Sequence, residues 1–421
     1  MQRRIMIAAA ATLAATAITL TGCSNNPAAE GDQVLTMISN SDFKAAVDGW
    51  ISDFEAANPG VTIQVTYAGG NDFESVVGTA IASGNAPDII DVLPGTSGQA
   101  STQENIKSGV LLDLSDQAWA ADVPQSVNSQ NQPDLDDDGV YAYPVLVQPM
   151  GAFYNLGTLE ETGLEPPTTW SDLLDFCADA KAAGKVAYSL GIADQWITQL
   201  IPFSLADTLV YGDEPSWGRD NALSNGDVTY PDSGWKDVFE KYNEMNANGC
   251  FNADPNALNL DASLAPVASG GAIGIVQVGG LFGNLQSLDD TQEYTLFALP
   301  ATDDPEETYM PASPAHEFGV SADSDQQQLA LKFIDFLAQP ANINKFVETI
   351  GGAVPAVPND EFEPPVLLEQ FNEFVANDRV RSFPFFSNAE VQNTLMVETQ
   401  NMFLGTATPQ QVVERMQAAV K

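Results

Sequence analysis

Residues 34–92 read VLTMISNSDFKAAVDGWISDFEAANPGVTIQVTYAGGNDFESVVGTAIASGNAPDIIDV, and this stretch decides the fold. Its apolar run at 34–38 predicts a buried strand, and apolar residues at helical spacing follow that run. An alternating strand at 61–65, a helix over 73–82 and an apolar strand at 88–92 come next. Strands and helices that alternate in this way predict a doubly wound α/β lobe.

The chain is too long for one such lobe. Its 421 residues exceed what a single hydrophobic core usually serves, so we expect two globular lobes. The later sequence also predicts both helices and strands. Its apolar patterns predict helices near 170–183 and 235–247, a strand at 273–278 and a helix near 329–337.

The charge of the chain excludes several classes of partner. The sequence has 57 acidic and 15 basic residues, which give a net charge of −42. This charge repels the phosphates of nucleic acids and the surface of an anionic membrane. His316 is the only histidine, so a catalytic triad or a His-rich metal site would have to include it. The composition therefore argues against nucleic-acid binding and against most common catalytic sites.

The N-terminus predicts export and anchoring. A basic start and an apolar run at 5–20 are typical of a secretory signal. The residues LTGC at 20–23 resemble a bacterial lipobox, which implies removal of the signal peptide 1–22 and acylation of Cys23. Residues 23–32 then form a polar, flexible tether, and the folded part lies outside the cell at the outer face of the membrane. The alternative is an ordinary secretory signal that contains a cysteine.

Two cysteines remain after Cys23. Outside the cytosol two such thiols usually pair, so we expect a disulfide between Cys177 and Cys250. A disulfide that closes the loop between these two cysteines contributes about 4 kcal/mol to the free energy of unfolding in the chain-entropy model. The alternative is two free buried thiols. Zinc is not expected, because further Cys or His ligands are lacking.

Nine short segments occur in a characteristic order. They are FEAANPGV (54–61), GNAPDI (84–89), YPV (143–145), FYN (153–155), PTTWSDL (167–173), ASGGA (268–272), LP (299–300), the helix at 330–337 and GGAVP (351–355). Each segment is weakly specific alone. In this order, from about residue 33 to the C-terminus, they resemble the extracellular sugar-binding lipoproteins of bacterial ABC importers, that is, solute-binding protein family 1.

This resemblance implies a two-lobed periplasmic-binding-protein-like fold of type II, with three crossing segments and a ligand cleft between the lobes. It places the N-lobe at 33–146 plus 298–320 and the C-lobe at 147–297 plus 321–421. The implied function is capture of a carbohydrate, an oligosaccharide, by hinge closure, and its delivery to the transmembrane permease subunits with their ATPase. The implied protein is a monomer without cofactor or catalytic activity.

The resemblance also implies polar ligand contacts. These are Asn40, Ser41, Asp42, Gly95, Thr96, Gln148 and His316. Planar acceptors and donors suit the hydroxyl groups of a sugar. For the loop after the first strand, a helix N-cap is an equally good interpretation and is compatible with sugar contact.

Aromatic side chains are expected to cover the apolar face of the sugar. Trp196 matches a segment where the family places a stacking ring, with a core tryptophan as the alternative. In GGLF at 279–282, Leu281 stands where the family has tryptophan, so Phe282 would supply the platform. Phe385 and Phe386 would cover a further sugar, with core packing as the alternative.

Two rival functions and one possible metal site remain. The acidity suits a receptor for a polyamine or another cationic solute, and a surface-anchored glycoside hydrolase would use two carboxylates. Residues DLDDDG at 134–139 resemble the first half of a calcium loop, but position twelve would be Val145 instead of Glu. A solvated acidic turn without metal is therefore the prediction for that segment.

Overall fold

The computed structural model describes residues 33–69, 72–95, 98–128, 131, 139–212, 222–223, 226–384, 386 and 388–420. Its strands join in one path with the order β2-β1-β3-β8-β4-β6-β5, while β10 pairs with β8 and both β7 and β9 pair with β4. The strands are β1 (Gln33–Asn40), β2 (Val61–Ala68), β3 (Ile89–Val92), β4 (Ala142–Asn155), β5 (Val186–Tyr188), β6 (Ala272–Val278), β7 (Tyr294–Phe297), β8 (Met310–Val320), β9 (Val354–Pro355) and β10 (Val380–Arg381).

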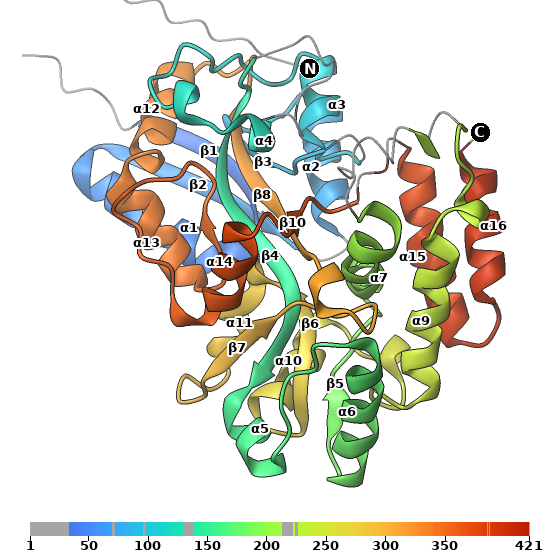
Figure 1. Cartoon of the computed structure of the whole chain (residues 1–421). Coiled ribbons are helices and arrows are strands. Elements are labelled where there is room, and N and C mark those ends of the chain that lie inside the picture. The colour runs from blue at the N-terminus through green and yellow to red at the C-terminus, as the bar shows by residue number, and fades with distance from the viewer. Residues whose placement is uncertain are drawn as a thin grey trace, which may run out of the picture.

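The first lobe is built on the segment that decides the fold. Strand β1 pairs in parallel with β2 and β3, and β3 pairs antiparallel with β8. Leu35 and Met37 of β1 face a core shared with α1 (Lys44–Ala57), while Ile38 faces the other side, where α2 (Phe73–Ala82) packs. Helices therefore cover both faces of this sheet, and the predicted strands and the helix at 73–82 are confirmed (Figure 1).

Local sequence explains where these elements begin and end. The Asn40 side chain accepts a hydrogen bond from the Asp42 N–H and caps η1 (Ser41–Phe43), which leads into α1. Helix α1 stops before Gly60, whose φ of 95° suits a residue without a side chain. At α6 (Trp170–Ala182), the Thr169 hydroxyl accepts a bond from the backbone of the first turn.

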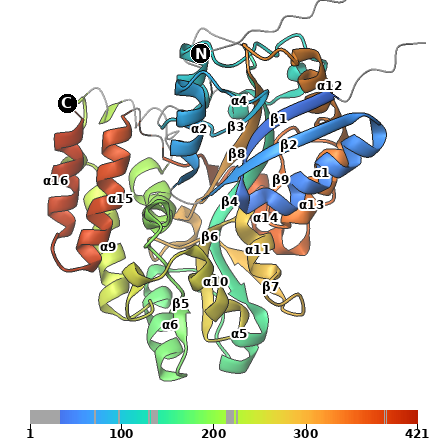
Figure 2. The ribbon, with the colours of Figure 1, turned by 180° about the vertical axis from the view of Figure 1, so that it is seen from behind.

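Two long strands pass from one lobe to the other. In β4, Val145 and Leu146 belong to the first core, whereas Met150 and Ala152 belong to the second. Strand β8 runs antiparallel beside β4 and changes core in the same way. Figure 1 shows β4 running down the middle of the molecule, and the view from behind separates β1 and β2 from β5 at the far end (Figure 2).

The second lobe packs helices around β4, β5, β6 and β7. Its helices are α5 (Leu156–Thr162), α6, α7 (Leu200–Ala206), α9 (Trp235–Ala247), α10 (Leu260–Ala268), α11 (Phe282–Gln286), α14 (Glu369–Ala376), α15 (Ala389–Phe403) and α16 (Pro409–Ala419). A disulfide joins Cys177 of α6 to Cys250, which follows α9, as predicted. Both cysteines are fully buried in this core.

The core membership of two later helices bears on the lobe boundaries. Helices α12 (Gln327–Leu337) and α13 (Pro340–Ile350) pack with α1 in the first core. By contrast, Leu299 and Met310 lie in the second core. The predicted division of the chain stays a prediction, and this packing favours moving both helices into the N-lobe. The first lobe also contains α3 (Thr102–Lys107) and α4 (Gln125–Asn128).

None of the helices in the described ranges is long and apolar enough to cross a membrane. The predicted signal peptide 1–22, the tether 23–32 with Cys23, and residues 134–138 of the acidic turn lie outside the described residues.

Candidate ligand-binding site

The loop after β1 lies where the two lobes meet. Asp42 is partly buried there, and burial raises its pKa above the usual value for aspartate. His316 lowers this pKa, while the carboxylates of Asp261 and Asp194 raise it further. Asp194 precedes η4 (Gln195–Gln199) and Asp261 lies in the first turn of α10, so both belong to the second lobe. The predicted contact Asp42 therefore lies within electrostatic range of polar groups on the opposite lobe.

Asn40 and Ser41, the two residues before Asp42, lie in different surroundings. The Asn40 side chain is used as the cap of η1, as the alternative interpretation predicted. Ser41 is exposed and lies against Gly69, where an added Cβ would come within 2.0 Å of the Ser41 hydroxyl. Because Gly69 has no side chain, it leaves room for the side chain of Ser41.

A buried carboxylate holds the only histidine in place. His316 Nδ1 lies 2.7 Å from Asp91 Oδ1. The other oxygen of Asp91 accepts bonds from the Ser39 hydroxyl (3.0 Å) and the Asn40 N–H (2.9 Å). An ionised carboxylate only accepts, so Nδ1 carries the proton and Nε2 is left as the second polar atom of the ring.

The backbone and ring of His316 are constrained as well. Its φ of 53° is in the left-handed region, which costs a residue with a side chain about 1–2 kcal/mol. The ring meets Phe43 edge to face at 4.5 Å between centroids and Phe73 at 5.9 Å. Asp91 and the two phenylalanines together keep the imidazole in one orientation.

A glycine turn of the second lobe meets the first lobe at the same place. Gly280, in η8 (Gly279–Leu281), donates its N–H to the side-chain oxygen of Gln148 at 3.0 Å. A Cβ on Gly280 would lie 2.3 Å from that oxygen and 3.2 Å from the Phe43 ring. Gln148 and Phe43 therefore both lie close to this backbone segment, and a side chain in place of Gly280 would crowd them.

Behind His316 lies a buried acid, the residue that follows it in the chain. Glu317 is fully buried and accepts bonds from the Asn131 amide (2.5 Å) and the Thr102 hydroxyl (2.9 Å). Burial raises the pKa of Glu317 to about 7. The predicted contacts did not include Asp91, although a single acid inside the apolar run 89–92 is a signal that could have indicated it.

The predicted aromatic platforms occupy different settings. Trp196 is half-buried in η4 and packs against the second core. Phe282 stacks on Phe153, with 5.7 Å between centroids, and its edge contacts Tyr294. Phe386 is 3% exposed and packs near Phe203 and Trp235, which agrees with the alternative of core packing.

Three further predictions concern the edge of the site. Gly95 is buried with a φ of 118°, and its carbonyl accepts a bond from the Ser101 hydroxyl. Thr96 and Phe385 lie outside the described residues. In the described ranges, no group of His, Cys, Asp and Glu is arranged to hold a metal ion. The ligand-contact roles of all these residues remain predictions.

The polar atoms gathered between the lobes offer acceptors from Asp42, Asp194 and Asp261 and a ring nitrogen from His316. Such groups bind hydroxylated or cationic small molecules by hydrogen bonds and charge.

Comparison with known proteins places the chain in a family. A family model described as bacterial extracellular solute-binding protein matches residues 49–363. The multiple sugar-binding protein of Streptococcus mutans is 24% identical over 43% of this chain, and the match spans 42% of that relative. The melibiose/raffinose/stachyose-binding protein MelE of Bacillus subtilis is 23% identical over 79% of this chain and 76% of its own length. The sn-glycerol-3-phosphate-binding protein UgpB of Escherichia coli K12 is 26% identical over 72% and 70%.

Solved structures show the same fold. RafE in complex with raffinose has a TM-score of 0.79 at 18% identity, covering 92% of this chain and 98% of its own. A sugar transporter protein of Bacillus licheniformis in complex with stachyose has a TM-score of 0.73 at 22% identity, covering 91% and 98%. The fold is therefore the predicted two-lobed one of the periplasmic-binding-protein type. Because the family model covers well over half of its length, the chain belongs to the bacterial extracellular solute-binding proteins.

Proposed function

We propose that the chain is the substrate-binding lipoprotein of an ABC importer and that it captures an oligosaccharide between its lobes. One observation carries the proposal: Asp42, Phe43 and His316 of the first lobe converge with polar groups and a glycine turn of the second. A sugar presents hydroxyl groups around an apolar ring, and this convergence offers partners for both.

The relatives support an uncharged sugar as ligand. MelE is named for melibiose, raffinose and stachyose, and two structures with the same fold hold raffinose or stachyose. UgpB is named for a phosphate ester. Here Asp42, Asp194 and Asp261 would repel a phosphate, so the local charge favours a neutral ligand over an anionic one.

Capture requires contacts to both lobes. A ligand shifts an equilibrium between open and closed forms only by binding one form more tightly. Gly280 supports closure of this kind, since its backbone lies so near Phe43 of the other lobe that an added Cβ would come within 3.2 Å of that ring. We propose that a sugar completes this contact and that the closed form delivers it to the permease subunits, with Cys23 as the lipid anchor at the outer face of the membrane.

The test is calorimetry of the purified chain with melibiose, raffinose and stachyose. We expect saturable binding of at least one sugar, and a loss of affinity of about tenfold or more in Asp42→Asn and in Trp196→Ala, because the first replaces a charged acceptor and the second removes a stacking ring from the proposed site. Asp360→Asn, at an exposed position outside the site, is the matched control and should bind as the wild type does. Wild-type affinity in both site variants would contradict the proposal.

A second candidate, a receptor for a cationic solute, is favoured by one observation. Asp194 and Asp261 of the second lobe both lie within electrostatic range of Asp42 of the first. Titration with spermidine under the same conditions separates the two functions. Tighter binding of spermidine than of every sugar would replace the main proposal with this one. Release of monosaccharides from raffinose by the purified chain would instead indicate a hydrolase.

A further inference from the structure

The short helix η4 carries one group of the candidate site and follows directly after another. Asp194 precedes the helix and lies within electrostatic range of Asp42 on the other lobe. Trp196, the predicted stacking ring, lies inside η4 and is half-buried. A 3-10 helix of five residues has poor hydrogen-bond geometry and little stability of its own. The orientation of the Trp196 ring therefore depends on the contacts that hold η4 from outside.

Backbone groups hold one side of the segment that leads into η4. The N–H of Ile192 donates to the carbonyl of Pro255 at 2.9 Å. The carboxylate of Asp194 accepts a hydrogen bond from the Leu260 N–H at 2.9 Å. The carbonyl of Ile192 still needs a donor, because this residue is fully buried and a buried carbonyl without a partner is costly.

Helix α15 supplies that donor. The side-chain amide of Gln400 donates to the carbonyl of Ile192 at 2.6 Å, and its Oε1 accepts from the side chain of Gln195 at 3.4 Å. At the other end of η4, the amide of Gln392 donates to Oε1 of Gln199 at 2.9 Å. The two glutamines of α15 lie about 12 Å apart along the helix axis, so α15 holds η4 at both of its ends.

Helix α15 is itself firmly placed. Its buried residues Leu395 and Met402 belong to the second core, together with Ile197 of η4. Helix α16 packs against α15 (Figure 1). A segment that is bonded to α15 is therefore fixed relative to the second lobe.

We propose that Gln400 and Gln392 are positioning residues of the candidate site, which hold η4 on α15 so that the Trp196 ring meets the ligand in one orientation. A ring that is already oriented loses little freedom when a ligand binds, and this raises the affinity. The contact between the ring and a sugar rests on the proposed function. The orientation of the ring in the free protein does not.

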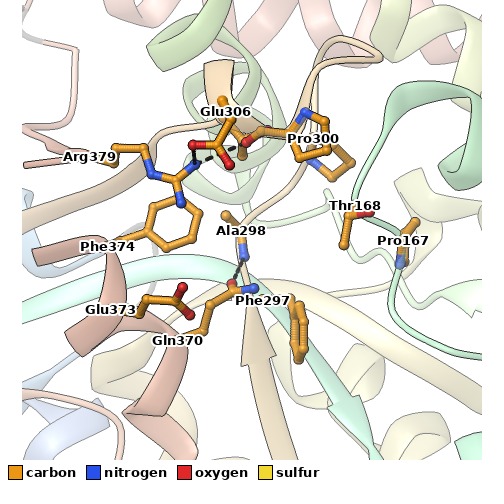
Figure 3. Close-up of a pocket in the computed structure, with 12 residues that line it drawn as sticks. Pro167, Thr168, Phe297, Ala298, Pro300, Glu306, Gln370, Glu373, Phe374 and Arg379 are labelled. Atoms are coloured by element: carbon orange, nitrogen blue, oxygen red, sulfur yellow. Dashed lines mark hydrogen bonds and ion pairs between the residues drawn. The ribbon is translucent and has the colours of Figure 1, made fainter. Parts of the chain in front are cut away.

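A similar contact elsewhere in the second lobe provides a matched control. In the hollow beside α14, Oε1 of Gln370 accepts from the Ala298 N–H at 2.7 Å (Figure 3). This bond also joins a glutamine on a helix to the backbone of another segment. It connects α14 to the residues after β7 and includes no residue of η4 or α15.

Fluorine NMR of the chain labelled with 5-fluorotryptophan tests the orientation without any ligand. The chain has six tryptophans, and the Trp196 signal is assigned from Trp196→Phe. Gln400→Met keeps the length of the side chain and removes both hydrogen bonds. We expect it to shift and broaden the Trp196 signal while the other five signals stay in place, which shows that the protein is folded. Gln370→Met should leave the Trp196 signal unchanged. A Trp196 signal that Gln400→Met does not alter, or that Gln370→Met alters as much, would overturn the proposal.

Calorimetry with melibiose, raffinose and stachyose measures the effect on affinity. Gln400→Met should weaken binding about three- to tenfold, as expected for one lost hydrogen bond. Gln410→Met, at an exposed position of α16 whose amide bonds within its own helix, should bind as the wild type does.

A double variant shows whether Gln400 acts through the ring. Added to Trp196→Ala, Gln400→Met should weaken binding by less than about twofold more, because the ring that it orients is already absent. An equal loss in both backgrounds would overturn the proposal. Sugar affinity that Trp196→Ala leaves unchanged would instead overturn the proposed role of the ring, and the ligand-free NMR signal would still decide whether the glutamines orient it.

Discussion

At the scale of single residues, Asp91 shows how one buried carboxyl group can orient the side chains of the candidate site. Its carboxylate is fully buried and has three hydrogen-bond partners, namely Ser39, the backbone of Asn40 and His316. A buried carboxylate with this many donors is compensated for the water it has lost. Its position at the end of β3 lets it connect β1 to β8 and set the orientation of the imidazole.

We predict that Asp91→Asn weakens both the fold and ligand binding. The amide presents one acceptor and one NH₂ group in place of two acceptors, so one donor among Ser39, Asn40 and His316 loses its partner. The expected cost is about 1–3 kcal/mol in the free energy of unfolding, measured in urea, with a loss of about tenfold in sugar affinity. Ser39→Ala, which removes one donor and leaves the carboxylate, should cost less. An Asp91→Asn protein as stable as the wild type would contradict the account.

Glu317 predicts a pH dependence of stability. Burial raises its pKa from the ordinary value of 4.5 to about 7, so the folded state binds the proton more tightly than the unfolded state. The stabilisation is fully present below pH 4.5 and is lost as the pH rises to about 7, by about 3 kcal/mol in all. Glu317→Gln mimics the protonated acid, so the free-energy difference between variant and wild type should grow in favour of the variant from pH 5 to pH 8. Equal pH profiles of the two proteins would sink this prediction.

At the scale of elements, the sequence predicted correctly those helices and strands that are recognised from the spacing of apolar residues within the element itself. Strand β1 and helix α2 formed where apolar spacing predicted them, because each pattern needs only its own neighbours to be recognised. The packing of α12 and α13 on α1 was not predicted, because an amphipathic helix does not specify which apolar surface it covers. Asp91 was missed for a related reason, since its partners Ser39 and His316 are distant in sequence.

Helix α1 contains a position at which stability should rise. Gly49 lies in its interior, and an added Cβ would meet nothing within 4 Å. Gly49→Ala is therefore expected to raise the free energy of unfolding by about 0.5–1 kcal/mol, because alanine loses less backbone freedom in a helix. Gly163→Ala is the matched control. Its surroundings are equally open, but its φ of 67° at the end of α5 disfavours a side chain, so it should destabilise. A Gly49→Ala protein less stable than the wild type would refute the prediction.

At the scale of the whole molecule, the two lobes share their crossing strands but not their cores. Val145 and Leu146 of β4 pack in the first core, and Met150 packs in the second. On the neighbouring strand β8, the core changes between Ala312 and Ala315, and His316 with its left-handed φ follows directly. His316 therefore combines a constrained backbone near the crossing with a polar ring in the candidate site, which supports the proposal that ligand contact is coupled to the relative position of the lobes.

The net charge of −42 makes a prediction for the molecule as a whole. Ion pairs such as Lys185 with Glu161 and Lys44 with Asp48 neutralise only a few of the 57 acids. The remaining charges repel one another more strongly in the compact state than in the unfolded chain. Salt screens this repulsion, since the Debye length falls from about 30 Å at 0.01 M to about 8 Å at 0.15 M. The unfolding temperature should therefore rise over that range, by the same amount in sodium chloride and in choline chloride because the screening is non-specific. A fall in the unfolding temperature would mean that attractive pairs outweigh the excess of acids, and a rise in sodium alone would point to a specific cation site.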